Sequence, residues 1–437
     1  MLSRRDALRL AALSAIAVSG PLSACASGDQ AGPVNDPGTN AGIDLASSDL
    51  ARTSGLPDAV PATVESLQRF AGHVFGEAAG EANAIISPYS IVMALAMTVN
   101  GAKGTTESEM LDVLGVDDLA RFNGGINALT QELESLGGNV TRGDGSKAEI
   151  ALDSANSLWG QRDTAWQNGF LDELARDYGT GMRQVDFVQA TETARGLINA
   201  WTADKTHDKI TDIIPPAVLD ALTRLVLVNA IYLKAPWESP FEPTLTRPGP
   251  FDGGRLTVAM MSEPEVSAAY RTGDGWQAAT LPYAGRALAM TIVLPDHGRL
   301  GDVEAALART GTAAFVAGGQ RRLLSLSMPK WTSRSDLGLG AALSELGMPT
   351  AFDATKADFS GMTTQEQLYI SAVLHQGYIA VDEEGTEAAA ATAVVMSTTS
   401  VPVTVPFVVD RPFLYVVHDV EHGTPLFLGR VADPTAV

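Results

Sequence analysis

Residues 418–422 read HDVEH, and their types and spacing could bind a metal ion. In zinc enzymes the H-x-x-E-H pattern lies on a helix, which places both histidines on one face. Here the segment lies between two strand-like runs and is followed by Gly423. We therefore predict a hairpin loop with no metal site, in which the two histidines are paired only by chance.

Ser327 and Lys330 are spaced as in the S-x-x-K nucleophile motif of penicillin-binding proteins. That motif should open a helix and be accompanied by S-D-N and K-T-G triplets. Pro329 lies inside the motif, and both triplets are missing from the sequence. A hydrolase acting on a small acyl substrate therefore remains the least favoured hypothesis, and we expect the chain not to be an enzyme.

The stretch from Glu383 to Ser400 reads EEGTEAAAATAVVMSTTS and has no single structural preference. Its alanine-rich first half favours a helix, whereas its Val, Ser and Thr residues favour a strand. The first proline after it is Pro402, so a central strand here would lose no ladder hydrogen bond. An ordinary flexible loop would favour Gly, Pro, Asn and Asp instead. The composition thus predicts a segment that can be either loop or strand.

Side chains alternate along a strand, which defines two faces if this stretch becomes one. Glu387 then points outward, where an ion costs little. The inward residues are all uncharged, namely Thr386, Ala388, Ala390, Thr392, Val394, Met396 and Thr398.

Helices dominate the first part of the domain and strands the second. Apolar spacing predicts a helix over Val64–Phe75, and Ser87 followed by Pro88 predicts the N-cap and first residue of a helix that runs to about Val99. The short connections between the later strands indicate a mixed α+β fold with antiparallel sheets. The predicted strands are Leu225–Leu233, Leu288–Leu294, Leu323–Met328, Phe407–Val409, Phe413–Val417 and Leu426–Val431.

The N-terminus has the pattern of an export signal. Residues 3–6 resemble a twin-arginine motif, and residues 22–25, LSAC, resemble a lipobox ending at Cys25, the only cysteine. We predict a signal peptide over 1–25, lipid attachment at Cys25, a flexible tether over 26–61 and one domain over 62–437. The alternative is a cleaved secretion signal with a chance cysteine. Either reading places the protein outside the cytoplasm, anchored to the cell membrane through lipid or secreted to the extracellular space.

The composition limits the possible partners. The formal net charge is −21 and the pI is near 4.6, whereas nucleic-acid binding requires clustered Lys and Arg. We therefore expect no nucleic-acid partner, and no motif in the chain indicates a cofactor.

From about residue 64 to its end, the chain resembles the serpins, with matching motifs in family order. The motifs are NAIISPYSIVMALAM at 83–97, GAKGT at 101–105, ANSLW at 155–159, INAW at 198–201, LVNAIY at 227–232, LPY at 281–283, LGM at 346–348, ADFSGM at 357–362, the hinge at 383–392 and RPF at 411–413.

The resemblance implies a serpin fold with three β-sheets, eight to nine helices and an exposed reactive-centre loop at about 383–406. It also implies a suicide inhibitor, a monomer that traps a serine protease covalently when its cleaved loop inserts into the main sheet. Ser87, Ser90, Asn229 and His375 match the family's polar cluster beneath that sheet, and Trp237 matches the tryptophan where the loop first enters. The implied hinge residues are Glu383, Gly385, Thr386, Glu387, Ala388, Ala389, Ala390, Ala391 and Thr392.

Counting from Glu383 as in the family places the cleaved bond between Thr399 and Ser400, although a shorter register would use Thr398 or Met396. No Arg or Lys occurs between Gly385 and Asp410, so the expected target is elastase-like or subtilisin-like rather than trypsin-like. The alternative function is that of a non-inhibitory serpin acting as a binding or carrier protein.

Overall fold

The computed structural model describes residues 42–387 and 403–436. Nine α-helices lie in these ranges: α1 Val60–Ala78, α2 Pro88–Val99, α3 Gly104–Leu114, α4 Leu119–Glu134, α5 Asn168–Tyr178, α6 Phe187–Lys205, α7 Leu300–Thr310, α8 Ala313–Val316 and α9 Gly340–Glu345. Three 3₁₀ helices join them: η1 Pro57–Ala59, η2 Pro243–Leu245 and η3 Pro349–Phe352. No described helix is both long and apolar enough to cross a bilayer.

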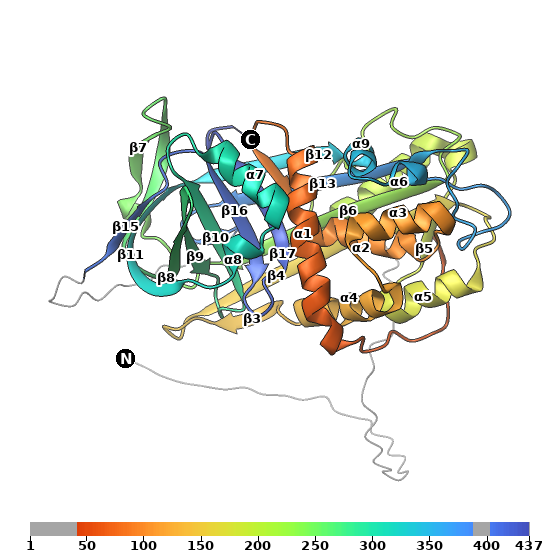
Figure 1. The fold of residues 1–437 in the computed structure, drawn as a ribbon, viewed down its shortest axis with the longest axis horizontal. Coiled ribbons are helices and arrows are strands. Elements are labelled where there is room, and N and C mark those ends of the chain that lie inside the picture. The colour runs from red at the N-terminus through yellow and green to blue at the C-terminus, as the bar shows by residue number, and fades with distance from the viewer. Residues whose placement is uncertain (1–41, 388–402, 437) are drawn as a thin grey trace, which may run out of the picture. The chain divides into compact units, whose positions relative to one another are not determined.

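The strands form two large sheets (Figure 1). The main sheet has the order β1 Asp44–Ala46, β5 Met182–Val185, β4 Lys147–Gln161, β6 Leu225–Pro236, β14 Gly385–Thr386, β13 Ala372–Val381 and β12 Trp331–Gly338, with β3 Gly138–Thr141 paired to β4. The second sheet has the order β15 Val405–Val408, β11 Gln320–Pro329, β8 Leu256–Gly273, β9 Trp276–Pro282, β10 Leu288–Pro295, β16 Phe413–Asp419, β17 Pro425–Val431 and β2 Ala84–Ile86, with β7 Arg247–Phe251 paired to β8.

The architecture confirms the predicted mixed α+β fold, but two details differ from expectation. The described strands form two sheets where three were expected. The long strand β8 joins two of the expected sheets into one, because its first part pairs with β7 and its last part with β9. The sheets are also not purely antiparallel. β13 pairs with β6, β4 with β5 and β11 with β15 in parallel, through long connections that local patterns did not show.

The part of the main sheet that lies between α2 and α6 is buried on both faces. Alternate residues of β6 belong to two different cores, with Leu225 and Leu227 in one and Val226 and Val228 in the other. α2 packs against the first face, and all twelve of its residues are buried. α6 packs against β4 on the other face, where Trp159 and Trp201 meet edge to face at 5.5 Å. A strand that inserts into this part of the sheet must therefore have apolar or small side chains on both of its faces.

The domain begins earlier than predicted. Asp44–Ala46 forms an edge strand, β1, antiparallel to β5, and α1 starts at Val60. The predicted tether of 26–61 is therefore wrong over its last part. The three-residue strand β1 is held by backbone pairing and by Arg162, which donates to Asp44 at 2.7 Å. It is mostly exposed and too short for an apolar pattern to be recognised.

Candidate functional site

β6 and β13 separate at one end of the main sheet, and the hinge fills the opening. The two strands pair directly where Val226–Ala230 faces Ala372–Gln376. Further along, Gly385 lies opposite Pro236 and Thr386 lies opposite both Ala235 and Val381, so β14 is hydrogen-bonded between them. The described chain thus contains the first two residues of an additional central strand.

Gly385 cannot easily be any other residue. Its φ is +149°, and a Cβ at this position would lie 2.4 Å from the carbonyl oxygen of Ala235. The next residue, Thr386, is 1% exposed and its hydroxyl lies 2.6 Å from the hydroxyl of Tyr283. The alternation predicted from the sequence therefore holds at its first position, where Thr386 points into the interior.

Trp237 and Phe241 hold the backbone carbonyls of residues 382–384, at the start of the hinge, by hydrogen bonds. The Trp237 backbone N–H donates to the Glu384 carbonyl at 2.8 Å, and its indole N–H donates to the Asp382 carbonyl at 3.0 Å. The Phe241 N–H donates to the Glu383 carbonyl at 2.8 Å. The Trp237 indole is also stacked on Tyr283, with ring centroids 4.7 Å apart. Trp237 thus links the hinge backbone to the Tyr283 ring beneath it.

Glu383 is buried and paired on both carboxylate oxygens. It forms an ion pair with Lys330, and the Thr246 hydroxyl donates to it at 2.6 Å. Burial alone would raise the pKa of Glu383, but the bonds from Lys330 and Thr246 outweigh it and the pKa is lowered. Lys330 therefore stabilises the hinge through its ion pair with Glu383.

The structure does not support the hydrolase hypothesis, because Lys330 pairs with Glu383 while Ser327 lies on β11 and bonds to Ser262.

Glu387 leaves the sheet on the opposite side from Thr386 and pairs with Lys209, in the segment between α6 and β6. Its side chain is 15% exposed, so the outward position expected from the sequence is more enclosed than predicted. Its φ is +51°, a left-handed conformation that a strand residue does not adopt. Continued insertion of the loop therefore requires Glu387 to change conformation and the ion pair to adjust.

We expect Lys209→Ala to speed loop insertion, because the ion pair stabilises the conformation that must be left. The pair is partly exposed and worth at most about 1 kcal/mol, which corresponds to a rate increase of up to about fivefold. The measurement is the rate of covalent complex formation with a target protease. Lys205→Ala is the matched control, since Lys205 pairs with Asp204 on the same helix. Equal rates for both variants would contradict this role of Lys209.

A polar cluster lies where β6 and β13 are directly paired, on the side facing α2. The Ser87 N–H donates to His375 Nε2 at 3.0 Å, and His375 Nδ1 lies 2.5 Å from Asn229 Oδ1. Because Nε2 accepts a hydrogen bond, the imidazole is neutral and carries its proton on Nδ1. Hydrogen bonds thus connect Ser87, His375 and Asn229 in a row.

The fourth predicted residue, Ser90, joins this cluster through Ser87 and also bonds to Asn156 of the main sheet. The Ser87 hydroxyl accepts from the Ser90 N–H at 3.2 Å as the N-cap of α2, and the Ser90 hydroxyl donates to Asn156 on β4. Asn156 lies directly opposite Asn229 in the β4–β6 ladder. Asn156 was missed as a cluster member, although it lies within the ANSLW motif.

Burial lowers the pKa of His375 from 6.5 to about 4. Between these values the unfolded chain binds a proton that the folded chain does not, so stability falls as the pH falls through this window and levels off below it. Each pKa unit is worth about 1.4 kcal/mol, so we expect a loss of up to about 3 kcal/mol between pH 6.5 and 4.

Urea unfolding at several pH values, compared between the parent chain and His375→Gln, measures the contribution of His375. The variant should be less stable at pH 7 but show a smaller loss on acidification. His418→Gln is the control for the other buried histidine, whose pKa burial also lowers. The same acid dependence in the parent chain and His375→Gln would exclude His375 as its source.

The H-x-x-E-H segment forms the predicted hairpin between β16 and β17. His418 is buried at the end of β16 and lies 2.9 Å from Thr291 Oγ1. His422 lies in the turn, 2.9 Å from Glu132 of α4. The two imidazoles have different partners, and the described residues contain no cluster of three or more metal-ligating side chains.

Several predicted site residues lie outside the described residues. They are Cys25, Ala388, Ala389, Ala390, Ala391, Thr392, Thr399 and Ser400. Conversely, Lys209, Thr246 and Lys330 were missed as hinge partners, since no local pattern connects them with residues far along the chain.

A family model for "Serpin (serine protease inhibitor)" matches residues 65–434. The chain is 36% identical to Serpin B6 of Bos taurus, over 80% of this chain and 93% of that protein, and 32% identical to leukocyte elastase inhibitor of Sus scrofa, with the same coverage. The crystal structure of tengpin, a thermophilic serpin in the native state, superposes with a TM-score of 0.77 at 26% identity, covering 89% of this chain and 97% of tengpin. The chain therefore belongs to the serpin family, whose members are protease inhibitors rather than enzymes.

Proposed function

We propose that this serpin inhibits a serine protease as a suicide substrate. The observation that carries the proposal is the position of Gly385 and Thr386, which already occupy the opening between β6 and β13. The sequence that follows Thr386 places only uncharged side chains inward and contains no proline before Pro402. A strand of fourteen residues, from Thr386 to Thr399, would extend about 46 Å along the sheet.

In the proposed reaction the protease serine attacks the carbonyl carbon of Thr399. The ester forms as the peptide bond breaks, and the departing nitrogen of Ser400 takes up a proton. The loop, now attached to the protease at its new end, continues from Thr386 as a strand between β6 and β13. Insertion carries the protease away from its starting position before water can hydrolyse the ester.

The target that we propose is an elastase-like or subtilisin-like protease. The residues around the proposed bond are small or modestly apolar, and no cation is present for a trypsin-like pocket. The similarity to leukocyte elastase inhibitor agrees with this choice. The carrier alternative would be expected to show bulky, charged or proline residues in the hinge. Beyond Glu387, the hinge to Thr392 has none.

The test mixes the chain from Ala26 onward with an elastase-like and a subtilisin-like protease, followed by a denaturing gel and intact mass. A covalent complex and a released peptide that starts at Ser400 support the proposal and fix the bond. Cleavage with neither a complex nor a change in thermal stability would favour the carrier alternative.

We also propose an extracytoplasmic location, through lipid on Cys25 or by secretion. The twin-arginine and lipobox patterns support it. A surface location would give the inhibitor access to secreted proteases. Cell fractionation of the parent chain and of Cys25→Ala tests the anchor. The parent should be in the membrane fraction and the variant released, whereas an unchanged distribution would exclude lipid attachment at Cys25.

A further inference from the structure

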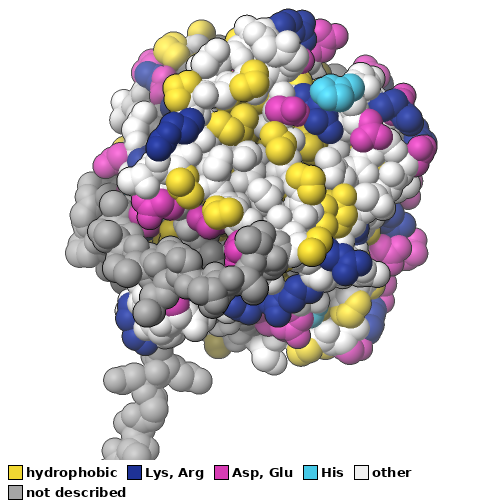
Figure 2. All heavy atoms as spheres, turned by 90° about the vertical axis from the view of Figure 1, so that its left-hand side faces the viewer, with side chains coloured by type: hydrophobic (Ala, Val, Ile, Leu, Met, Phe, Trp, Pro, Cys, Tyr) yellow, Lys and Arg dark blue, Asp and Glu magenta, His cyan; other side chains and the backbone are white. Residues whose placement is uncertain are grey.

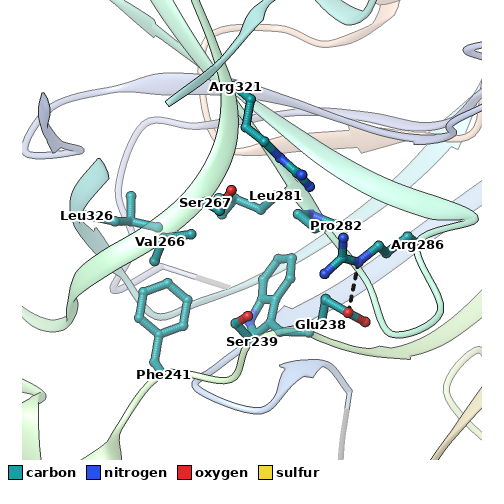
Figure 3. Close-up of a pocket in the computed structure, with 11 residues that line it drawn as sticks. Glu238, Ser239, Phe241, Val266, Ser267, Leu281, Pro282, Arg286, Arg321 and Leu326 are labelled. Carbon is teal, nitrogen blue, oxygen red and sulfur yellow. Dashed lines mark hydrogen bonds and ion pairs between the residues drawn. The ribbon is translucent and has the colours of Figure 1, made fainter. Parts of the chain in front are cut away.

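A small cavity of about 160 Å³ lies beside Trp237, between the second sheet and the segment that follows β6 (Figure 3). Its apolar wall consists of side chains from four parts of the chain, and two arginines, Arg286 and Arg321, extend over it from different elements. Ser239 and Ser267 add hydroxyl groups. The apolar lining residues are Trp237, Phe241, Val266, Leu281, Pro282 and Leu326.

Within the described residues, one of the two positive charges at the cavity has no acidic partner, because Glu238 pairs with Arg286 and no carboxylate pairs with Arg321. Glu238, the one acidic lining residue, is 5% exposed at its side chain and already accepts from the Gly143 N–H at 2.8 Å, the Gly285 N–H at 3.1 Å and Arg286 Nε at 2.9 Å. Within the described residues the Nη groups of Arg286 donate no hydrogen bond, and the guanidinium group of Arg321 forms neither a hydrogen bond nor an ion pair. The sequence from 388 to 402 contains no carboxylate that could supply one.

This local excess of positive charge contrasts with the chain as a whole, whose formal net charge is −21. On the face shown in Figure 2, basic, acidic and hydrophobic side chains are interspersed. Two guanidinium groups over an apolar wall match one kind of ligand, an anion with an apolar body, because arginine binds carboxylates through charge-assisted hydrogen bonds. The cavity is smaller than the roughly 300–1,000 Å³ of sites for drug-sized ligands, which limits the ligand to about one ring.

We propose that this cavity is a binding site for a small amphipathic carboxylate, and that its ligand controls the hinge. The carboxylate contacts Arg321 and the free Nη groups of Arg286, while the ring or branched chain packs on Trp237 and Phe241. The regulatory half of this proposal rests on the proposed inhibitor function, whereas ligand binding does not.

Control of the hinge follows from the dual role of the two aromatic residues. The backbone N–H groups of Trp237 and Phe241 hold the carbonyls of Glu384 and Glu383, and the Trp237 ring stacks on Tyr283, the partner of Thr386. A ligand packed on these rings stabilises the present position of the hinge relative to the fully inserted form. Bound ligand therefore slows insertion, and at ten times its Kd by up to about tenfold.

Binding is tested by isothermal titration calorimetry with 3-phenylpropionate as the probe. We expect one saturable site, with at least tenfold weaker binding for the neutral 3-phenylpropionamide and for Arg321→Ala. Arg322→Ala is the matched control, because the next residue of β11 points to the other face and should leave the affinity unchanged. No saturable binding, equal binding of acid and amide, or full affinity in Arg321→Ala would overturn the site.

Regulation is tested by forming the covalent protease complex with and without saturating 3-phenylpropionate. The probe should slow complex formation by the parent chain and leave Arg321→Ala unaffected. Binding without any effect on the rate would overturn the regulatory half. Absence of a complex under all conditions would instead count against the inhibitor function, while the calorimetric result stands independently.

Discussion

Thr386→Arg is expected to convert the chain from an inhibitor into a substrate of its target protease. The Thr386 side chain is enclosed between β6 and β13 and contacts the Tyr283 hydroxyl, with no acidic side chain of the described residues bonded to it. Burying an unpaired cation there costs at least about 3 kcal/mol. The arginine is therefore expected to leave the sheet before cleavage, and its return during insertion raises the barrier by that amount. Insertion slows more than 100-fold, so hydrolysis of the acyl ester precedes it.

The measurement is the ratio of covalent complex to cleaved chain on a denaturing gel. Thr386→Ser is the control, because it keeps the hydroxyl that meets Tyr283 and should still trap the protease. Thr386→Arg should give cleaved chain almost exclusively. Efficient trapping by this variant would show that inhibition does not require residue 386 to be buried in the sheet.

Glu383→Lys is expected to lower the free energy of unfolding by about 1–3 kcal/mol, since it removes charge-assisted hydrogen bonds from a buried position while the exposed part of Lys330 remains solvated. The substitution removes the ion pair with Lys330 and the hydrogen bond from Thr246, and it places two ammonium groups beside each other. The effect should be visible as a lower midpoint in urea unfolding at pH 7.

The reversed pair, Glu383→Lys with Lys330→Glu, separates the ion pair from general damage to the site. The second substitution should recover at least about half of the lost stability, because it restores opposite charges across the contact. If the two substitutions instead destabilise additively, the Lys330 contact does not stabilise the hinge.

The sequence predicted those helices and strands whose signals lie within a few neighbouring residues. Ser87 and Pro88 gave the start of α2 because a cap hydroxyl and a first-position proline act within one turn. The apolar runs at β6, β10, β16 and β17 are buried on both faces and are nearly continuous in the sequence. Helices and strands could therefore be predicted from the sequence wherever all residues of a segment are buried.

The remaining features depend on contacts between distant segments. β4 begins with polar, partly exposed residues, so its length was not apparent. The pairing of β13 with β6 and β12 joins segments that no local pattern connects. Lys330 was considered first as part of a short nucleophile motif, and only the fold shows that it faces Glu383. The resemblance located the hinge, but its ion pairs required the three-dimensional arrangement.

The central claim is that the cleaved loop becomes a strand between β6 and β13. Its most direct test is the thermal unfolding midpoint of the chain before and after the loop is cut by a protease of another class that is not trapped. A new central strand adds more than ten backbone hydrogen bonds at about 1 kcal/mol each, together with the burial of its side chains. In a domain of about 400 residues each kcal/mol raises the midpoint by about 1 °C. We expect the midpoint to rise by at least about 10 °C. A midpoint that stays the same or falls after complete cleavage would contradict insertion.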